Sequence, residues 1–166
     1  NLIWKYGEER NSRKIARTIV YHRPISSTLE LANIIAHSSG KAYHKIHPAT
    51  RTFQALRIAV NHELQSLEDF LPEAIKALNV GGRLGVISFH SLEDRIAKRF
   101  LASRSLEAPK GSRHLPEQKS TAGAASFHLV NRRPLIPSEG ETRSNPRARS
   151  AHLRAAVRTE APAHAL

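Results

Sequence analysis

Two side chains with useful chemistry stand where a predicted strand gives way to a predicted helix. They are His90 and Ser91, and Asp94 follows within the helix. Ligands of open α/β sheets bind beyond the carboxyl ends of the strands, and an imidazole with a near-neutral pKa can orient a substrate or take its proton. We therefore hypothesise that His90 and Ser91 line a pocket. A structural alternative stays open, in which Ser91 caps the helix and His90 is a hydrogen-bonded turn residue.

Hydrolytic and metal-dependent chemistry are both disfavoured by the spacing of the residues. Ser88, His90 and Asp94 could suggest a hydrolase triad. Neither Ser88 nor Ser91 lies in a G-x-S-x-G turn, so such a triad is not expected. His44 and His47 have the spacing of metal ligands, but the chain has no cysteine, and no carboxylate lies near them to complete a zinc site. We therefore predict no metal centre.

A glycine pair, Gly81 and Gly82, precedes a predicted strand. A loop that cradles a phosphate or a dinucleotide follows a strand and opens a helix, so this pair is better explained as a helix stop. The chain contains neither a G-x-G-x-x-G motif nor a Walker A motif. We predict that no cofactor-binding residue lies in this chain, and that the main binding loop of any nucleotide-like cofactor lies outside it.

Basic residues outnumber acidic residues by 26 to 14, which gives the 166-residue chain a net charge of +12. Such a charge favours a polyanionic partner, most simply nucleic acid. The small number of aromatic residues argues against a large surface for stacking single strands. Three clusters of basic residues, on two predicted helices and in a late turn, are candidates for gripping phosphates. The candidates are Arg51, Arg57, Lys98, Arg99, Arg147 and Arg149.

The first part of the chain is expected to be helical. A basic helix is predicted over residues 1–22, and Pro24 ends it. Ser27, with Glu30 three residues later, forms a capping-box pattern for the next helix, which should stop near residues 38–40.

A long amphipathic helix is predicted from about Pro48 to Leu71, because apolar residues recur there at spacings of three and four. Pro72 should then begin a new turn, followed by a second helical piece. The apolar stripe of the long helix consists of Phe53, Leu56, Val60, Leu64, Leu67 and Leu71.

The remainder of the chain has the pattern of an α/β sheet. Residues 83–89 form a short apolar segment with little alternation, which suits a strand covered on both faces. A helix capped by Ser91 should follow, and then a long loop over residues 103–125. Residues 127–136 and 151–158 are predicted to form an antiparallel pair of strands. The order helix, strand, helix, strand, strand is the back part of an α/β sheet.

The composition excludes several classes of protein. Without cysteine there is no disulfide scaffold, no Cys-ligated zinc site and no thiol nucleophile. No apolar run approaches the ~20 residues that a membrane span needs, and no signal-peptide core is present, so we expect a soluble, cytoplasmic protein. A chain that begins at Asn1 and contains no Met lacks a translation start. This favours a piece of a longer protein over a processed chain.

Several motifs together resemble those of the RsmH (MraW) methyltransferases. The resemblance covers nearly the whole chain, and two long and specific motifs carry it. These are His47-Pro-Ala-Thr-Arg-Thr-Phe-Gln-Ala-Leu-Arg57-Ile and Ile87-Ser-Phe-His-Ser-Leu-Glu-Asp-Arg-Ile96. Shorter matches are Tyr6-Gly-Glu-Glu-Arg10, Gly81-Gly-Arg-Leu and Asn145-Pro-Arg-Ala-Arg-Ser150.

The resemblance implies an α/β fold: a partial class I (Rossmann-like) methyltransferase domain preceded by a helical inserted domain. By that likeness, residues 1–65 hold most of the inserted, substrate-recognition domain, and residues 66–166 hold the carboxyl-terminal part of the methyltransferase domain. The implied reaction transfers a methyl group from S-adenosyl-L-methionine to the N4 amino group of a cytidine in small-subunit (16S) ribosomal RNA. The implied partner is that RNA or the 30S particle, with no membrane, and a homodimer is left open.

The amino-terminal half of such enzymes has no counterpart in this chain. Because that half carries the glycine-rich first loop and most of the cofactor contacts, the chain is similar to a carboxyl-terminal half, and we expect it to be inactive alone. It would supply about three strands of a seven-stranded sheet, and one edge of the sheet would be bare. His90 and Ser91 would line the pocket for the cytidine.

Two alternatives remain. One is a non-catalytic basic RNA-binding protein that is complete as it stands. It explains the positive charge and the missing cofactor loop, but not an apolar strand without partners. The other is a structural module that docks onto a separate amino-terminal subunit.

Overall fold

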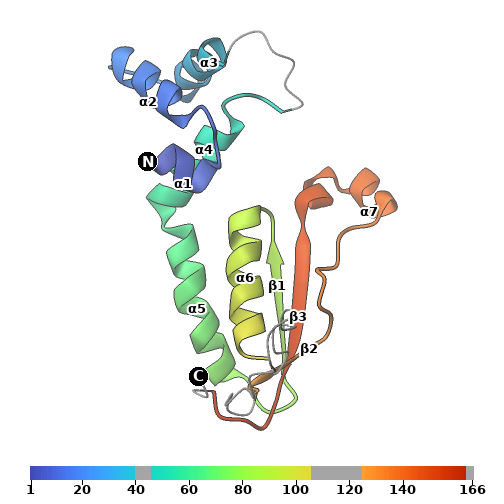
Figure 1. The fold of residues 1–166 in the computed structure, drawn as a ribbon. Helices are drawn as coiled ribbons and strands as arrows, with labels where there is room; N and C mark the ends of the chain where they lie inside the picture. Colours follow the sequence, from blue (N-terminus) through green and yellow to red (C-terminus); the bar gives the residue numbers. More distant parts are fainter. Residues whose placement is uncertain (40–45, 106–124, 164–166) are drawn as a thin grey trace, which may run out of the picture. The chain divides into compact units, whose positions relative to one another are not determined.

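The computed structural model describes residues 1–39, 46–105 and 125–163. The chain divides into two compact units, Asn1–Glu63 and Leu64–Leu166 (Figure 1). The first unit is helical, and the second combines helices with a three-stranded sheet. Most of the predicted loops at 41–46 and 103–125 lies outside the described residues.

The described residues of the first unit form four helices, of which α1 packs against α4 and α2 against α3. Gly7 allows a close approach of α1 to α4, since a Cβ atom added there would stand 2.6 Å from the backbone oxygen of Arg51. The helices are α1 (Leu2–Gly7), α2 (Ser12–Tyr21), α3 (Thr28–Ser38) and α4 (Thr50–Asn61). The buried apolar side chains that hold the helices together are Ile3, Ile15, Ile35 and Ala49.

The helix predicted over residues 1–22 is in fact two helices. Glu8 adopts a left-handed backbone conformation (φ 48°) that ends α1, and the Glu9 carboxylate accepts a hydrogen bond from the Asn11 N–H at 2.8 Å. This local turn is not visible in the apolar periodicity. The predicted cap of α3 is confirmed, because the Ser27 hydroxyl accepts the Glu30 N–H at 3.1 Å.

The single long helix predicted from Pro48 to Leu71 is also wrong. The chain breaks at His62, which has a left-handed backbone (φ 52°), and α5 (Glu63–Ala77) then runs through Pro72. A proline removes one helical hydrogen bond, but apolar packing on both sides of Pro72 keeps this helix continuous.

The break divides the apolar stripe that suggested one helix. Val60, a member of that stripe, is 75% exposed, whereas other positions on the two helices are buried. The buried residues are Thr52, Ala55 and Ile58 on α4, and Leu71 and Ile75 on α5.

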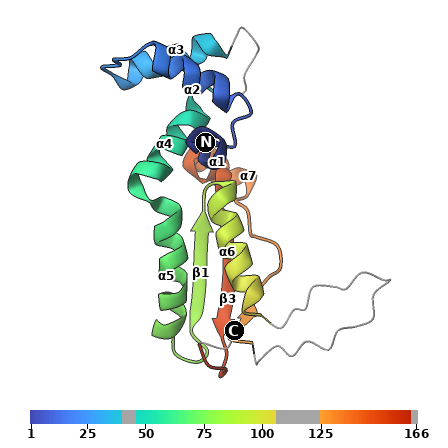
Figure 2. The ribbon, with the colours of Figure 1, turned by 60° about the vertical axis from the view of Figure 1, so that its left-hand side comes forward.

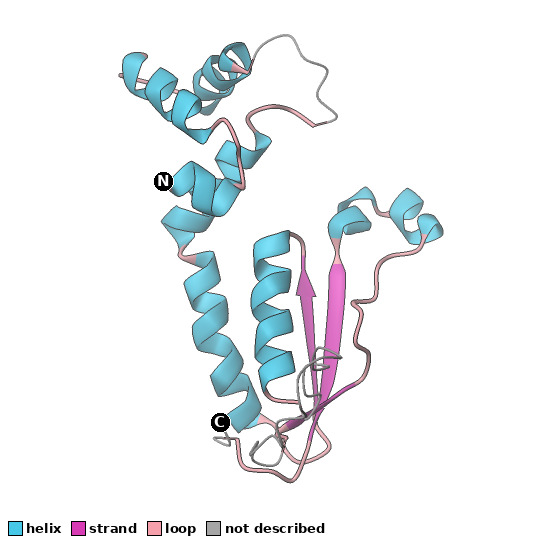
Figure 3. Ribbon diagram, in the orientation of Figure 1, coloured by secondary structure: helices cyan, strands magenta, loops and turns pink. Residues whose placement is uncertain are grey.

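The second unit is built on a sheet of three strands in the order β1-β3-β2. The strands are β1 (Arg83–Ser88), β2 (Phe127–Leu129) and β3 (His152–Arg158). The central strand β3 is antiparallel to both neighbours, as Figure 2 shows for β1 and β3. Helices α5 and α6 (Ser91–Ser103) cover one face of the sheet (Figure 3). The core residues there are Leu71, Ile75, Leu84, Leu101, Phe127 and Ala156.

The prediction that the first strand is covered on both faces is wrong for the described part of the chain. Leu84 and Ser88 are buried on the face toward the helices, but Ile87 on the opposite face is 60% exposed. Gly81 takes the positive φ (79°) expected of the turn that precedes this strand.

The final pair of strands is confirmed as antiparallel, but the first of the two is shorter than predicted. β2 ends at Leu129. Beyond it, the Val130 N–H donates to the Ala155 oxygen at 3.0 Å, and Leu135 forms an isolated bridge with Leu153. Pro134 lacks the N–H that a ladder requires. Within the turn-rich segment that follows, the structure forms α7 (Glu139–Ser144) and the 3-10 helix η1 (Pro146–Ser150). No helix in the described ranges has the length and apolar character needed to cross a lipid bilayer.

Candidate functional site

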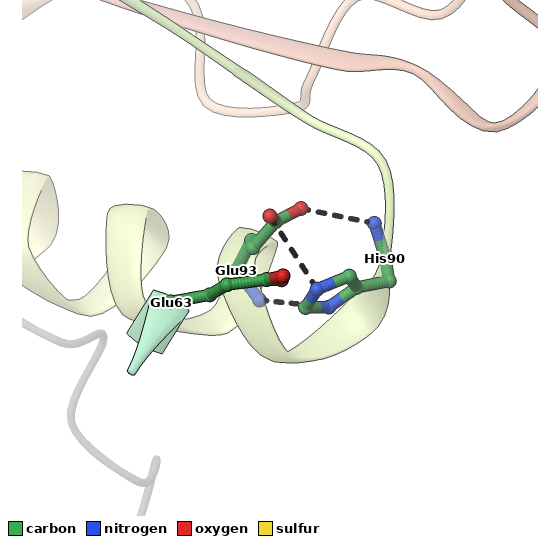
Figure 4. A group of neighbouring side chains, drawn as sticks. All are labelled: Glu63, His90 and Glu93. Atoms are coloured by element: carbon green, nitrogen blue, oxygen red, sulfur yellow. Dashed lines mark hydrogen bonds and ion pairs between the residues drawn. The ribbon is translucent and has the colours of Figure 1, made fainter. Parts of the chain in front are cut away.

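The turn between β1 and α6 is closed by a reciprocal capping box. His90, and not Ser91, is the N-cap: its Nδ1 accepts the Glu93 N–H at 3.4 Å. In return the Glu93 carboxylate accepts the N–H groups of Phe89 (2.9 Å) and His90 (3.3 Å) (Figure 4). Ser91 is the first residue of the helix, so the predicted cap on Ser91 with Asp94 is one residue out of register.

The capping box determines which nitrogen of His90 carries a proton. Because Nδ1 accepts a hydrogen bond, the neutral ring holds its proton on Nε2. Nε2 is buried, lies 3.4 Å from Glu93 Oε1 and forms no hydrogen bond within the described residues. The ring is therefore placed to donate through Nε2, and it can accept a proton at Nδ1 only by giving up the cap. Glu63, which Figure 4 also draws, belongs to the first unit.

Asp94, next to the capping box, is held by an arginine from the sheet. Arg154 on β3 donates from Nε to Oδ1 at 2.7 Å and from Nη2 to Oδ2 at 2.9 Å. Both side chains are largely buried. The hydrogen bonds from Arg154 keep the pKa of Asp94 below its usual value of 3.8. The pair ties the first turn of α6 to the central strand, and so supports the turn that carries His90.

The sequence analysis missed Arg154 and a second buried arginine, Arg158. Arg158 donates to the backbone oxygens of Ser126, Thr159 and Ala161. A signal for both was present, because positions 154, 156 and 158 alternate along a strand and therefore share one face. When such a face is covered, each of its arginines needs an acceptor inside the protein.

The two predicted phosphate contacts on α4 have acidic partners. Arg57 forms a bidentate salt bridge with Glu63, in which Nε donates to Oε1 at 2.8 Å and Nη2 donates to Oε2 at 3.1 Å. Arg51 lies 3.9 Å from Glu9. These arginines are therefore less available to an outside anion than the sequence suggested.

The other four predicted contacts are exposed, on α6 and on η1. None of the four is in an ion pair within the described part of the chain. They are Lys98, Arg99, Arg147 and Arg149. Arg51 and Arg57 belong to the first unit and these four to the second, so no single unit holds all six.

Comparison with known proteins identifies the family. A model of the MraW methylase family matches residues 1–159. The chain belongs to the MraW methylase family. It is 54% identical over 99% of its length to "Ribosomal RNA small subunit methyltransferase H" of Bradyrhizobium diazoefficiens, and it covers 50% of that protein. Proteins of the same name from Paramagnetospirillum magneticum (52% identity, 98% of this chain and 52% of the relative) and Caulobacter vibrioides (54%, 97% and 53%) are also similar.

The chain therefore spans about half the length of the MraW methylase relatives that it matches, in their carboxyl-terminal part. Methylases use a methyl donor, which needs a binding site in the protein. The turn after β1 supplies Phe89 and His90 but no glycine, and the glycine pair stands before β1. The described residues thus contain no glycine loop between a strand and a helix of the kind that cradles a nucleotide-like cofactor.

Proposed function

We propose that the chain is the carboxyl-terminal part of an enzyme that methylates the N4 amino group of a cytidine in small-subunit ribosomal RNA. The methyl donor is S-adenosyl-L-methionine, and the enzyme works in the cytoplasm on the RNA or on the ribosomal particle. The observation that carries this proposal is the 54% identity, over 99% of the chain, to a protein named for that RNA. The sheet supports a class I methyltransferase fold, because β1 and β2 run parallel with the antiparallel β3 between them.

The cofactor site belongs mainly to the amino-terminal half of the enzyme. Two features of the second unit suggest where that half packs: β1 is an edge strand of the sheet, and its outward face leaves Ile87 exposed, as is Phe89 just beyond it. An unpaired edge with exposed apolar side chains is a surface for further strands and helices. The chain alone is therefore proposed to be inactive.

The contribution of this chain is to position the cytosine and its RNA. The cofactor supplies an electrophilic methyl group, and the exocyclic amine of cytosine attacks poorly because its lone pair is delocalised into the ring. A cytidine must also leave the RNA stack to reach a pocket. We propose that His90, held by its capping box, orients the base through Nε2–H, with Ser91 beside it. The structure argues for a hydrogen-bond donor here and not for a proton acceptor.

The first unit is proposed to recognise the substrate, and exposed cations of the second unit to bind phosphates. Salt-sensitive contacts from Lys98, Arg99, Arg147 and Arg149 fit that purpose. Arg51 and Arg57 would join them only by leaving Glu9 and Glu63.

A fusion protein tests the proposal. The amino-terminal half of the Bradyrhizobium diazoefficiens relative is joined to this chain and incubated with unmethylated small ribosomal subunits and labelled S-adenosyl-L-methionine. The expected product is N4-methylcytidine, identified by mass spectrometry of the nucleosides, with none from either half alone. A folded, cofactor-binding fusion that transfers no methyl group, or that methylates another atom, contradicts the proposal. RNA binding by an inert fusion would favour the non-catalytic alternative.

A further inference from the structure

The first unit contains a groove of about 910 Å³ that is lined by arginines and apolar residues. Its lining residues come from α1, α2 and the turns next to them, with one residue from α4. Figure 1 labels these three helices. This volume is within the range of small-ligand sites and suits one or two nucleotides rather than a duplex. None of the described residues that line the groove is acidic. Its lining includes Trp4, Arg10, Arg13, Arg17, Val20 and Arg23.

The helix α2 presents its arginines to the groove because of its periodicity. Ile15 is buried in the core of the unit, and Ile19 packs against the same core. The opposite side of the helix carries Arg13, Arg17 and Val20, all exposed. Positions 13, 17 and 20 recur at the spacing of one helical face, so the fold itself aligns the guanidinium groups along one wall.

Within the described part of the chain, no acidic side chain pairs with the arginines of the groove. None of the four arginine side chains that line it forms an ion pair or a hydrogen bond within the described residues. Elsewhere in the same unit, Arg57 is held by both oxygens of Glu63. Four like charges without partners repel one another and attract an anion. The groove therefore favours a ligand with several negative charges spaced along it.

The ligand has an aromatic or flat component as well as charge. Trp4 lines the groove with its side chain 60% exposed, beside the exposed Val20. An exposed indole next to guanidinium groups is the arrangement on which an unpaired base stacks while arginines hold the adjacent phosphates. We propose that this groove binds a single-stranded RNA segment, with one base on Trp4 and phosphates on Arg10, Arg13, Arg17 and Arg23.

This inference rests on the proposed function for the identity of the RNA, and it assigns that RNA a surface on the first unit that the sequence analysis did not name. The binding itself needs neither the cofactor nor methyl transfer. It can therefore be measured on the 166-residue chain as it is.

Trp4 is the only tryptophan in the chain, so its fluorescence reports on the groove directly. The chain is titrated with a ten-nucleotide single-stranded RNA of mixed sequence, while the anisotropy of a fluorescein-labelled copy follows binding independently. We expect saturable quenching of Trp4 with the same midpoint as the anisotropy change, and weaker quenching by a duplex of the same sequence. Binding by anisotropy without any change in Trp4 fluorescence would overturn the proposal. So would equal quenching by polyglutamate, which would point to an acidic protein segment.

Charge variants separate the groove from general attraction by a basic protein. Arg13→Gln with Arg17→Gln removes two charges from the groove. Lys76→Gln with Arg143→Gln removes two charges from exposed pairs in the second unit and leaves the same net charge. We expect the groove variant to lower the slope of log affinity against log salt by about 1.4, at about 0.7 for each lost phosphate contact. An equal loss in the matched control variant would overturn the proposal.

Trp4→Leu tests the stacking contact. Because base–aromatic stacking contributes about fivefold or more to affinity, labelled RNA should bind at least about fivefold more weakly, and Trp4→Tyr should restore most of that loss. Circular dichroism checks that the variants remain folded. If Trp4→Leu binds as the parent does, no base stacks there and the proposal fails.

The two proposals can fail separately. If the fusion methylates ribosomal RNA but RNA does not change the fluorescence of Trp4, the proposed RNA site in the groove is wrong and the proposed function stands. If the groove binds RNA but the folded fusion transfers no methyl group, the proposed RNA site stands and the proposed function is wrong.

Discussion

In the first unit, Arg13 and Arg17 line a groove and have no acidic partner among the described residues. In the second unit, Arg154 forms a bidentate salt bridge with Asp94. The residue type is the same, and the surroundings differ. In the groove the guanidinium groups remain hydrated, so their charge is available to a ligand. On the covered face of the sheet a guanidinium group has left water, so its charge must be satisfied inside the protein. An arginine count therefore says little about binding until the paired arginines are subtracted.

The largest effect should come from removing the buried arginine. Arg154→Ala leaves the Asp94 carboxylate largely buried, without its two hydrogen bonds from Arg154 and with His152 Nδ1 at 3.8 Å. This should lower the free energy of unfolding by about 3 kcal/mol. Arg17→Ala, which breaks no pair, should change it by less than about 0.5 kcal/mol. Urea denaturation followed by circular dichroism measures both. Equal losses of unfolding free energy for Arg154→Ala and Arg17→Ala would contradict the distinction between the buried, paired arginine and the exposed arginine of the groove.

A smaller effect is expected at the capping box. His90→Ala should lower the free energy of unfolding by about 1 kcal/mol, because the helix loses its N-cap. In the fusion enzyme it should lower kcat more than RNA affinity. His90→Asn is the matched variant, since an asparagine oxygen can cap the helix but cannot reproduce Nε2–H. It should restore stability and leave kcat low. Equal loss of turnover and affinity, or no loss, would remove His90 from the mechanism.

The smallest effect is a dependence on acid. Because Arg154 lowers the pKa of Asp94 in the folded protein, the pair contributes its full stability above the ordinary pKa of 3.8, and loses it as the pH falls from there through the lowered pKa. The difference in unfolding free energy between the parent and Arg154→Ala should therefore be larger at pH 5 than at pH 3. A difference that does not narrow in acid would mean that the Asp94 charge is not what Arg154 balances.

Features determined by neighbours in the sequence were predicted well. The cap by Ser27, the turn at Gly81 and the order of the three strands with α5 and α6 in the second unit depend on a few adjacent residues, and the structure confirms them. The short helices α7 and η1, which form where only turns were predicted, were missed. The predicted helix boundaries were wrong where the apolar pattern of one helix continued into the next without a visible break. The apolar stripe crosses His62 without interruption, although the backbone turns there, and Pro72 signals a break that packing overrides.

In the candidate site, too, the features determined by adjacent residues were predicted and those determined by distant residues were not. Its position after β1 and its residues His90 and Ser91 came from the sequence alone, and their place in a pocket remains a prediction. The sequence predicted the N-cap at Ser91, one residue from the observed N-cap His90. An error of one residue is common at helix boundaries. Arg154 was missed because its partner Asp94 is sixty residues away, and no local pattern records that distance.

The sequence by itself determined the family, the excess of positive charge, and the segments that could become helices or strands, because motifs, composition and periodicity are properties of the chain. Only the tertiary structure decided which arginines are paired. Arg57 is held by Glu63 and Arg154 by Asp94, while Arg13 and Arg17 face a groove. The physical reason is that a charge is neutralised or left available by its neighbours in space, and folding chooses those neighbours.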